Sequence, residues 1–158
     1  MRHLLLPLLL MIPACSPQAA EQAPAPVAQP SVHPVSGLPV IPLKITSLGK
    51  VHNFRVELAR SPQEQAKGLM FRTEMGPDEG MIFPYDPPRV LSFWMKNTVL
   101  SLDLVFIGPD HKVINVAPNA VPYSEDSILS DAPAIATLEL NAGRAAALNI
   151  VPGAQVDW

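Results

Sequence analysis

Charged and polar side chains that stand beside apolar runs are the residues of this chain best placed to do chemistry. Five of them are Arg72, Lys96, Asn97, Asp103 and Glu139. Within "VLSLDLVFI", the alternation of a β-strand gives Asp103 apolar neighbours on both faces. Burying a carboxylate there is costly unless it is paired or hydrogen-bonded, so Asp103 must have a partner.

The segment "FWMKNT" supplies the simplest partner for Asp103. Strand alternation puts Trp94 and Lys96 on one face, and a turn at Asn97 and Thr98 would bring Lys96 toward Asp103. The sequence leaves two interpretations of this pair open. It is either a structural ion pair that fixes the strand register or part of a polar pocket.

Three functions are consistent with these residues. In a binding pocket, Trp94 would stack on a small polar ligand, a saccharide or an anion, while Arg72 and Lys96 donate to its oxygens. In a hydrolase-like enzyme, Asp103 or Glu139 would act as general acid or base beside Lys96, with a shifted pKa in an open cleft. In an envelope interaction module, the charges would only hold the fold, and an apolar patch would meet a protein partner.

The composition argues against several other classes of protein. The formal net charge of -3 does not suit a nucleic-acid partner, which requires a basic surface. The four histidines are scattered, and none stands at a metal-ligand spacing from another or from the single cysteine, so we expect no metal site and no cofactor. The methionines lie among Leu, Phe and Trp, which favours core filling over copper ligation.

The amino terminus reads as an export signal. A cation at Arg2 precedes an apolar run over residues 4–12, which is too short to cross a bilayer. "IPAC" resembles the lipobox of bacterial lipoproteins, so residues 1–14 are predicted to be a signal peptide and Cys15 the lipidated residue that anchors the chain in the bilayer. The alternative is an ordinary secretory signal that leaves Cys15 as a free thiol. Ser16, where inner-membrane lipoproteins often carry aspartate, favours the outer membrane in a host that has one.

Residues 15–42 are rich in Pro, Ala and Gln and contain no Lys or Arg, which predicts an extended tether. The folded domain is predicted over residues 43–158. Its first part reads as a hairpin of "LKITSL" and "HNFRVELA" around Gly49 and Lys50, followed by a short helix. That helix has Ser61 as its N-cap and Glu64 in a capping box, and we expect it to end near Gly68.

The rest of the domain alternates strand-like runs with turn-formers. Strands are predicted at 80–85, 90–97, 101–108, 112–118, 135–141 and 154–157, with a second short helix at 142–148 capped by Asn141. Several short strands without long intervening helices indicate a mainly β fold. We expect a small antiparallel β-sandwich or barrel-like domain with one or two short helices.

The ordered set "KGLMFR", "EGMIFPY", "FWMKNT", "LDLVFI" and "LELNAG" resembles the bacterial and archaeal family called domain of unknown function 192. The resemblance covers nearly the whole folded part, and it implies a compact, mainly β, often exported domain without an established activity. The family's polar signature residues match Arg72, Lys96, Asn97, Asp103 and Glu139, which the burial argument also selects. The leading hypothesis is therefore an exported, membrane-anchored lipoprotein whose β domain binds a small polar ligand.

Overall fold

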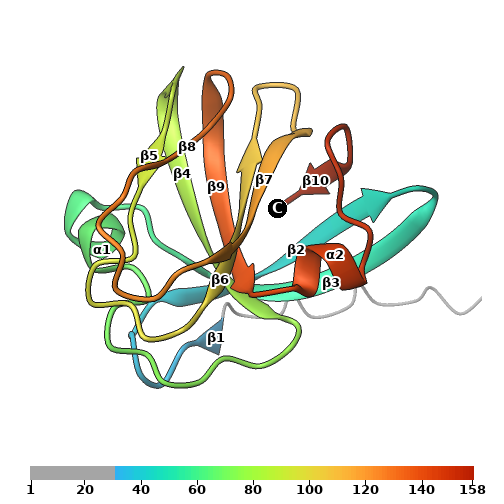
Figure 1. Ribbon diagram of the computed structural model, residues 1–158. Coiled ribbons are helices and arrows are strands. Elements are labelled where there is room, and N and C mark those ends of the chain that lie inside the picture. The colour runs from blue at the N-terminus through green and yellow to red at the C-terminus, as the bar shows by residue number, and fades with distance from the viewer. Residues whose placement is uncertain (1–30) are drawn as a thin grey trace, which may run out of the picture.

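The computed structural model describes residues 31–158, so the predicted signal peptide and Cys15 lie outside the described residues. Its elements, in chain order, are β1 (Ser31–Val32), β2 (Pro39–Ser47), β3 (Lys50–Leu58), α1 (Pro62–Lys67), β4 (Glu79–Arg89), β5 (Ser92–Phe93), β6 (Leu102–Ile107), β7 (Val113–Ala120), β8 (Ile128–Leu129), β9 (Ala134–Asn141), α2 (Arg144–Ala147) and β10 (Gln155–Asp157). Figure 1 shows strands dominating the domain, with one short helix on each side of the sheet. None of the helices described is long and apolar enough to cross a membrane.

One curved sheet forms the body of the domain, in the order β1-β2-β3-β4-β9-β6-β7, with β10 beside β2 (Figure 1). All of its pairs are antiparallel except β3 and β4, which α1 connects in parallel. A single bridge from Lys112 to Gln155 links its far edges, but the sheet does not close into a barrel. The prediction of a mainly β, largely antiparallel domain with two short helices is confirmed.

The first hairpin and α1 form where local sequence signals place them. Leu48 and Gly49 both adopt positive φ, as a tight two-residue hairpin turn requires, so the turn lies one residue earlier than predicted. At α1, the Ser61 side chain accepts from the Glu64 backbone N–H, and the Glu64 carboxylate accepts from the Ser61 N–H. This reciprocal capping box is the one that the sequence predicts.

Apolar side chains cover both faces of the sheet. The face beneath α2, here called the α2 face, packs Leu43, Ile45, Val56 and Leu138. The opposite face, here called the β5 face, packs Met81, Met95, Leu104 and Phe106, together with partly buried groups such as Phe93 of β5. Because β6 lies centrally between these two cores, all six of its residues are buried.

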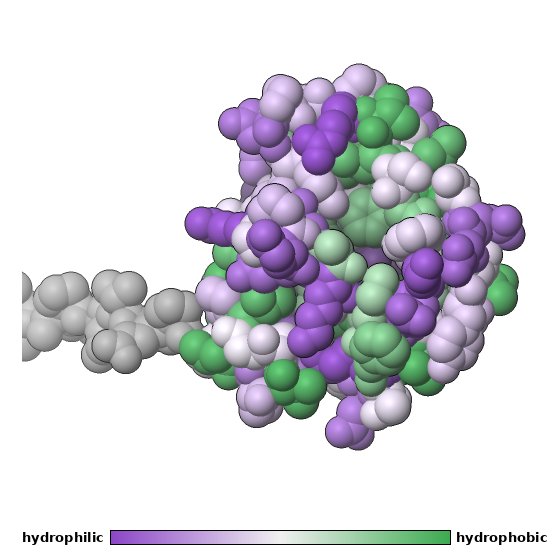
Figure 2. Space-filling model, turned by 90° about the vertical axis from the view of Figure 1, so that its left-hand side faces the viewer, coloured by the Kyte–Doolittle hydropathy of each residue, from purple (hydrophilic) through white to green (hydrophobic). Residues whose placement is uncertain are grey.

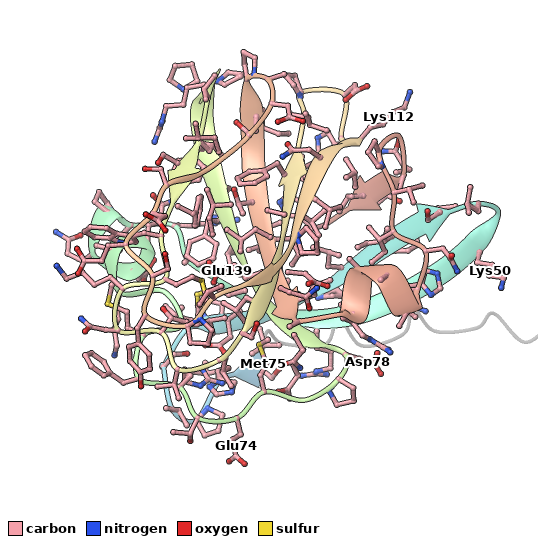
Figure 3. The ribbon with its side chains drawn as sticks, viewed as in Figure 1. Lys50, Glu74, Met75, Asp78, Lys112 and Glu139 are labelled. Carbon is pink, nitrogen blue, oxygen red and sulfur yellow. The ribbon has the colours of Figure 1, made fainter. Side chains whose placement is uncertain are left out.

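Strand β9 carries polar residues on the β5 face. Thr137 lies opposite Phe83 of β4, and Glu139 lies opposite Met81, so both point into the core of that face. Asn141 follows two residues later and donates to the carbonyls of Met75 and Gly76. Figure 3 places Glu139 between the strands. The strand therefore delivers a carboxyl group to an otherwise apolar interior.

Several predicted boundaries differ from the structure, two of them near the pocket and α2. The strand expected at 90–97 is only Ser92–Phe93, because the chain turns where the Thr98 N–H donates to the Met95 carbonyl and Asn97 adopts positive φ. The second helix begins after Gly143 rather than Asn141, which is still part of β9.

Strand structure also extends into residues assigned to the tether. Val40 and Ile41 continue the hairpin by pairing with Glu57 and Val56, a tertiary pairing that composition does not reveal. The division into signal peptide, tether and domain otherwise stays a prediction.

Candidate ligand-binding pocket

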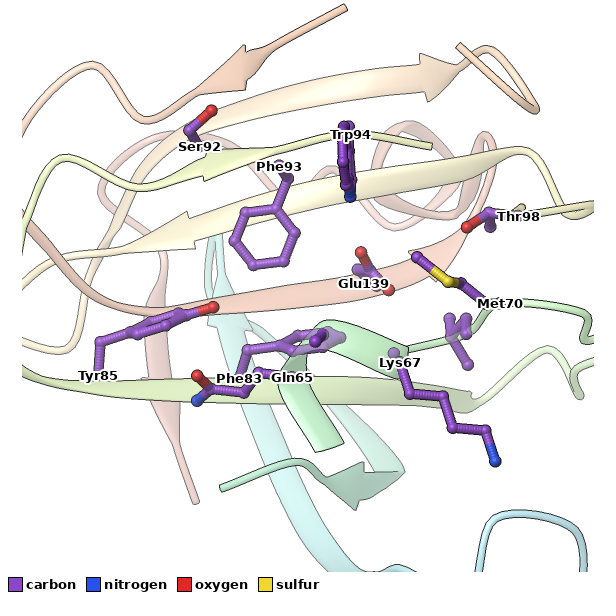
Figure 4. Close-up of a pocket in the computed structure, with 13 residues that line it drawn as sticks. Gln65, Lys67, Met70, Phe83, Tyr85, Ser92, Phe93, Trp94, Thr98 and Glu139 are labelled. Carbon is purple, nitrogen blue, oxygen red and sulfur yellow. The ribbon is translucent and has the colours of Figure 1, made fainter. Parts of the chain in front are cut away.

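A cavity of about 290 Å³ opens on the β5 face, between α1 and the small β5–β8 sheet. Its lining comes from α1 and the loop after it, β4, β5, the loop after β5, and β9 (Figure 4). The lining residues are Gln65, Ala66, Lys67, Gly68, Leu69, Met70, Phe83, Tyr85, Ser92, Phe93, Trp94, Thr98 and Glu139. Figure 2 looks onto the side of the molecule that carries α1 and β5, and it shows apolar surface recessed between hydrophilic side chains.

Hydrogen bonds and close packing fix α1 against β4. The Gln65 amide donates to the carbonyl of Pro84 at 2.8 Å and to that of Ala59 at 3.3 Å. At the helix end, Gly68 has φ +47, and a Cβ there would stand 3.4 Å from the Phe83 ring. Glycine adopts positive φ without strain and has no Cβ to contact the ring. The end of α1 can therefore pack directly against Phe83.

Glu139 is the one carboxylic acid among the described residues that line the cavity, and it is only 5% exposed. Burial raises the pKa of the Glu139 carboxyl from its ordinary value to about 8, and no cation or hydrogen bond from the described part of the chain contributes an opposing shift. The group is therefore un-ionised at neutral pH. In that form it has one O–H donor and a free carbonyl acceptor, both directed at the cavity (Figure 4).

Aromatic rings surround this carboxyl. Phe93 contacts Phe83 and Tyr85 edge-on, with ring centroids 5.3 Å and 6.4 Å apart. Trp94 is half exposed at the mouth, and Figure 4 shows the nitrogen edge of its indole turned toward Glu139. The site thus joins apolar walls to a few convergent polar atoms, as small-molecule pockets commonly do.

Asp103 lies on the opposite face of the sheet, where it is fully buried. Its Oδ1 accepts from the backbone N–H groups of Asn119 at 2.9 Å and Gly143 at 3.0 Å, and its Oδ2 accepts from that of Ala145 at 2.8 Å. The expectation that Asp103 needs a partner is met by backbone amides of β7 and of the start of α2. The predicted Lys96–Asp103 pair is wrong, because β5 pairs with β8 rather than with β6 and the Lys96 ammonium lies beside Glu125.

Lys96 and Asn97 lie in the loop after β5, outside the pocket lining. The Lys96 ammonium is 3.6 Å from the Glu125 carboxylate and 5.0 Å from the centroid of the Trp94 ring, on the surface. Asn97 has φ +55, and its carbonyl accepts the Phe71 N–H at 2.9 Å. Lys96 therefore supports the exposed tryptophan face, and Asn97 shapes the turn.

Arg72 belongs to a separate buried cluster. Its guanidinium is 2.7 Å from Glu57, which is 3% exposed, and 3.1 Å from the ring of His33. Of the six residues expected at a site, only Trp94 and Glu139 line the pocket. Gln65, Tyr85 and Phe93 were not predicted as site residues, because in apolar or helical runs they resemble ordinary packing residues.

The chain matches one protein-family model and is similar to solved structures. A family model described as DUF192, Uncharacterized ACR, matches residues 43–158. A crystal structure of a protein of unknown function from Novosphingobium aromaticivorans is 51% identical, with a TM-score of 0.80, and covers 92% of this chain and 100% of its own. A Sinorhizobium meliloti protein described as a candidate transcription regulator is 39% identical, with a TM-score of 0.74, over 76% of this chain and 94% of its own. No curated protein matches the chain.

Proposed function

The chain belongs to the DUF192 family, and on that premise we propose that it is an exported lipoprotein whose β domain binds a small, uncharged polar ligand of the saccharide class. One observation carries the proposal: the un-ionised Glu139 carboxyl, at the base of an aromatic pocket, has no hydrogen-bond partner among the described residues. A sugar ring offers C–H faces for Trp94 and hydroxyl groups for Glu139, which suits such a mixed lining.

A saccharide fits this pocket better than an anion does. Arg72 and Lys96, the cations expected to hold an anion, are engaged by Glu57 and Glu125 outside the cavity. Lys67 belongs to the lining, but Figure 4 shows its ammonium directed away from Glu139. An anion in the cavity would therefore face a carboxyl group without a compensating charge.

Catalysis by Glu139 is the second candidate function. An un-ionised carboxyl at neutral pH in an apolar pocket has the protonation state of a general acid. The described lining holds no second carboxylate, which the common two-carboxylate route to glycoside hydrolysis requires. Asp103 is enclosed on the other face and cannot serve. Binding is therefore the better-supported function.

We do not extend the description of the Sinorhizobium meliloti protein as a transcription regulator to this chain. A DNA-binding surface draws its affinity from phosphate-neutralising cations, and this chain has a formal net charge of -3.

Thermal unfolding of the purified protein with neutral saccharides, polyols and anions tests the proposal. A ligand at 100 times its Kd adds about 2.7 kcal/mol to stability, which shifts the melting temperature by several degrees. We expect a neutral saccharide to give this shift, Trp94→Ala to lose most of it, and Lys50→Ala, an exposed cation outside the pocket lining, to keep it. Stabilisation by anions alone, or none by any probe, would contradict saccharide binding, and the second result would favour a protein-interaction role.

A further inference from the structure

Three of the polar groups that face the pocket interior can donate hydrogen bonds to a ligand. The Trp94 indole nitrogen can only donate, and in Figure 4 it is turned toward Glu139. The Tyr85 hydroxyl enters the cavity from β4, and the un-ionised Glu139 contributes a third O–H from β9. The Gln65 amide nitrogen already donates to two backbone carbonyls, so it is not free for a ligand.

We infer that the Glu139 carboxyl donates a hydrogen bond to a carbonyl oxygen of its ligand, and that the ligand is a saccharide with a neutral acyl substituent such as an N-acetyl group. This inference rests on the proposed function and specifies the ligand class of the same site. A carbonyl oxygen has two lone pairs, so it can accept from both Glu139 and Trp94. The methyl group of an N-acetyl substituent would pack against the ring of Phe93.

The surroundings of Glu139 explain why it stays un-ionised. Its neighbours across the sheet are Met81 on β4 and Leu104 on β6, both fully buried and apolar. Phe83 and Phe93 add two rings to the wall. Ionisation would leave an uncompensated charge among these apolar groups, which is costly.

The ionisable groups around the pocket do not offset that cost. From β4, Tyr85 presents a phenol whose own pKa is raised by burial, and the Arg89 guanidinium stacks on the Tyr85 ring, 4.5 Å from its centroid. From α1, the Lys67 ammonium points away from Glu139. After β5, the Lys96 ammonium lies over the Trp94 ring and beside Glu125. Arg72 is neutralised by Glu57, which lies two strands away from Glu139, beyond Met81. A cationic ligand binds best to an ionised carboxylate. Because Glu139 is un-ionised, the pocket favours neutral ligands instead.

Titration calorimetry at pH 6.5 and pH 9.5 tests this inference with N-acetylglucosamine, glucosamine and glucose as probes. For wild type at pH 6.5, we expect N-acetylglucosamine to bind at least tenfold more tightly than the other two. At pH 9.5 its affinity should fall at least tenfold, because few molecules retain a proton on a group whose pKa is about 8. Glu139→Gln keeps an N–H donor of similar shape but cannot ionise, so its affinity should change by less than about twofold between the two pH values. Circular dichroism at both pH values confirms that each variant stays folded.

Other outcomes separate this inference from the proposed function. Equal, pH-independent binding of glucose and N-acetylglucosamine overturns the donor role of Glu139 while leaving saccharide binding intact. A pH dependence shared by wild type and Glu139→Gln assigns the titration to another group and overturns the inference as well. Absence of binding by all three probes at both pH values overturns both proposals. Tyr85→Phe serves as a matched control, because it removes the neighbouring hydroxyl and should leave the pH dependence unchanged.

Discussion

Burial of the Glu139 carboxyl makes the free energy of unfolding depend on pH in a way that can be measured. Its folded-state pKa of about 8 lies above the unfolded value of 4.5, so between these values the folded state retains a proton that the unfolded state has lost. The stability that this group contributes is complete below pH 4.5 and falls as pH rises toward 8. A single group of this kind changes the free energy of unfolding by about 1.4 kcal/mol per pH unit within the window.

We predict that Glu139→Gln removes this slope. Urea unfolding at pH 5 and at pH 8 should show wild type losing roughly 2 kcal/mol or more relative to the variant, because a glutamine side chain has no carboxyl proton to release. The comparison cancels the titration of all other groups, since both proteins share them. Parallel stability profiles for wild type and variant would show that Glu139 is ionised in the folded protein.

The need for a partner at Asp103 is predictable from the sequence, but the identity of that partner is not. Strand alternation shows that Asp103 is buried, and burial energetics demand compensation. The compensation comes from backbone amides at Asn119, Gly143 and Ala145, which no side-chain pattern encodes. Glu139 is selected by the same reasoning, yet its environment depends on rings such as Phe93 that only the folded chain brings to it.

At the scale of elements, the contact between β4 and β9 holds the pocket in shape. Gly80 on β4 lies so close to β9 that a Cβ there would stand 2.5 Å from the Glu139 carbonyl oxygen and 3.0 Å from the Leu140 side chain. Because the obstructing atom is backbone, relief requires the strands to separate. The position of the Glu139 side chain therefore depends on a glycine in the neighbouring strand.

We predict that Gly80→Ala destabilises the domain by roughly 2 kcal/mol or more, as overpacking in a core does, and weakens ligand binding through displacement of β9. Urea unfolding and calorimetry with N-acetylglucosamine measure the two effects. Gly37→Ala is the control: Gly37 has positive φ but no atom within 4 Å of its added Cβ, so it should cost about 1–2 kcal/mol and leave binding unchanged. Wild-type stability and affinity in Gly80→Ala would contradict the tight contact.

Elements with local start and stop signals were predictable, and those defined by tertiary contact were not. The Leu48–Gly49 turn and the Ser61 capping box are encoded within a few residues, so the hairpin and α1 follow from the sequence. The run at 90–97 has the composition of a strand, but its backbone bonds to other loops: the Met95 N–H donates to the Ser124 carbonyl. That non-local bond helps to place Trp94 at the mouth of the pocket.

At the scale of the whole molecule, the fold separates its structural charges from its site. Asp103 on the α2 face accepts from backbone amides, and Glu57 pairs with Arg72 through one of its two oxygens. The carboxyl in the pocket has no such partner among the described residues. Charged groups such as Lys50, Glu74 and Lys112 lie at the periphery (Figure 3). The location of such a domain would be set by the proposed amino-terminal anchor rather than by a charged surface.

We propose that this anchor is a lipid on Cys15, because the apolar run before it is too short to span a bilayer and two or more acyl chains suffice for stable attachment. Cells expressing the wild-type gene should incorporate labelled palmitate into the protein and retain it in the membrane fraction. Cys15→Ser should lose the label and the membrane attachment, since serine provides no thiol for acylation. Ser16→Asp is the matched control, which should keep the label but move the protein toward the inner membrane in a host with two membranes. A wild-type protein that is exported without the label would instead support an ordinary secretory signal with a free thiol.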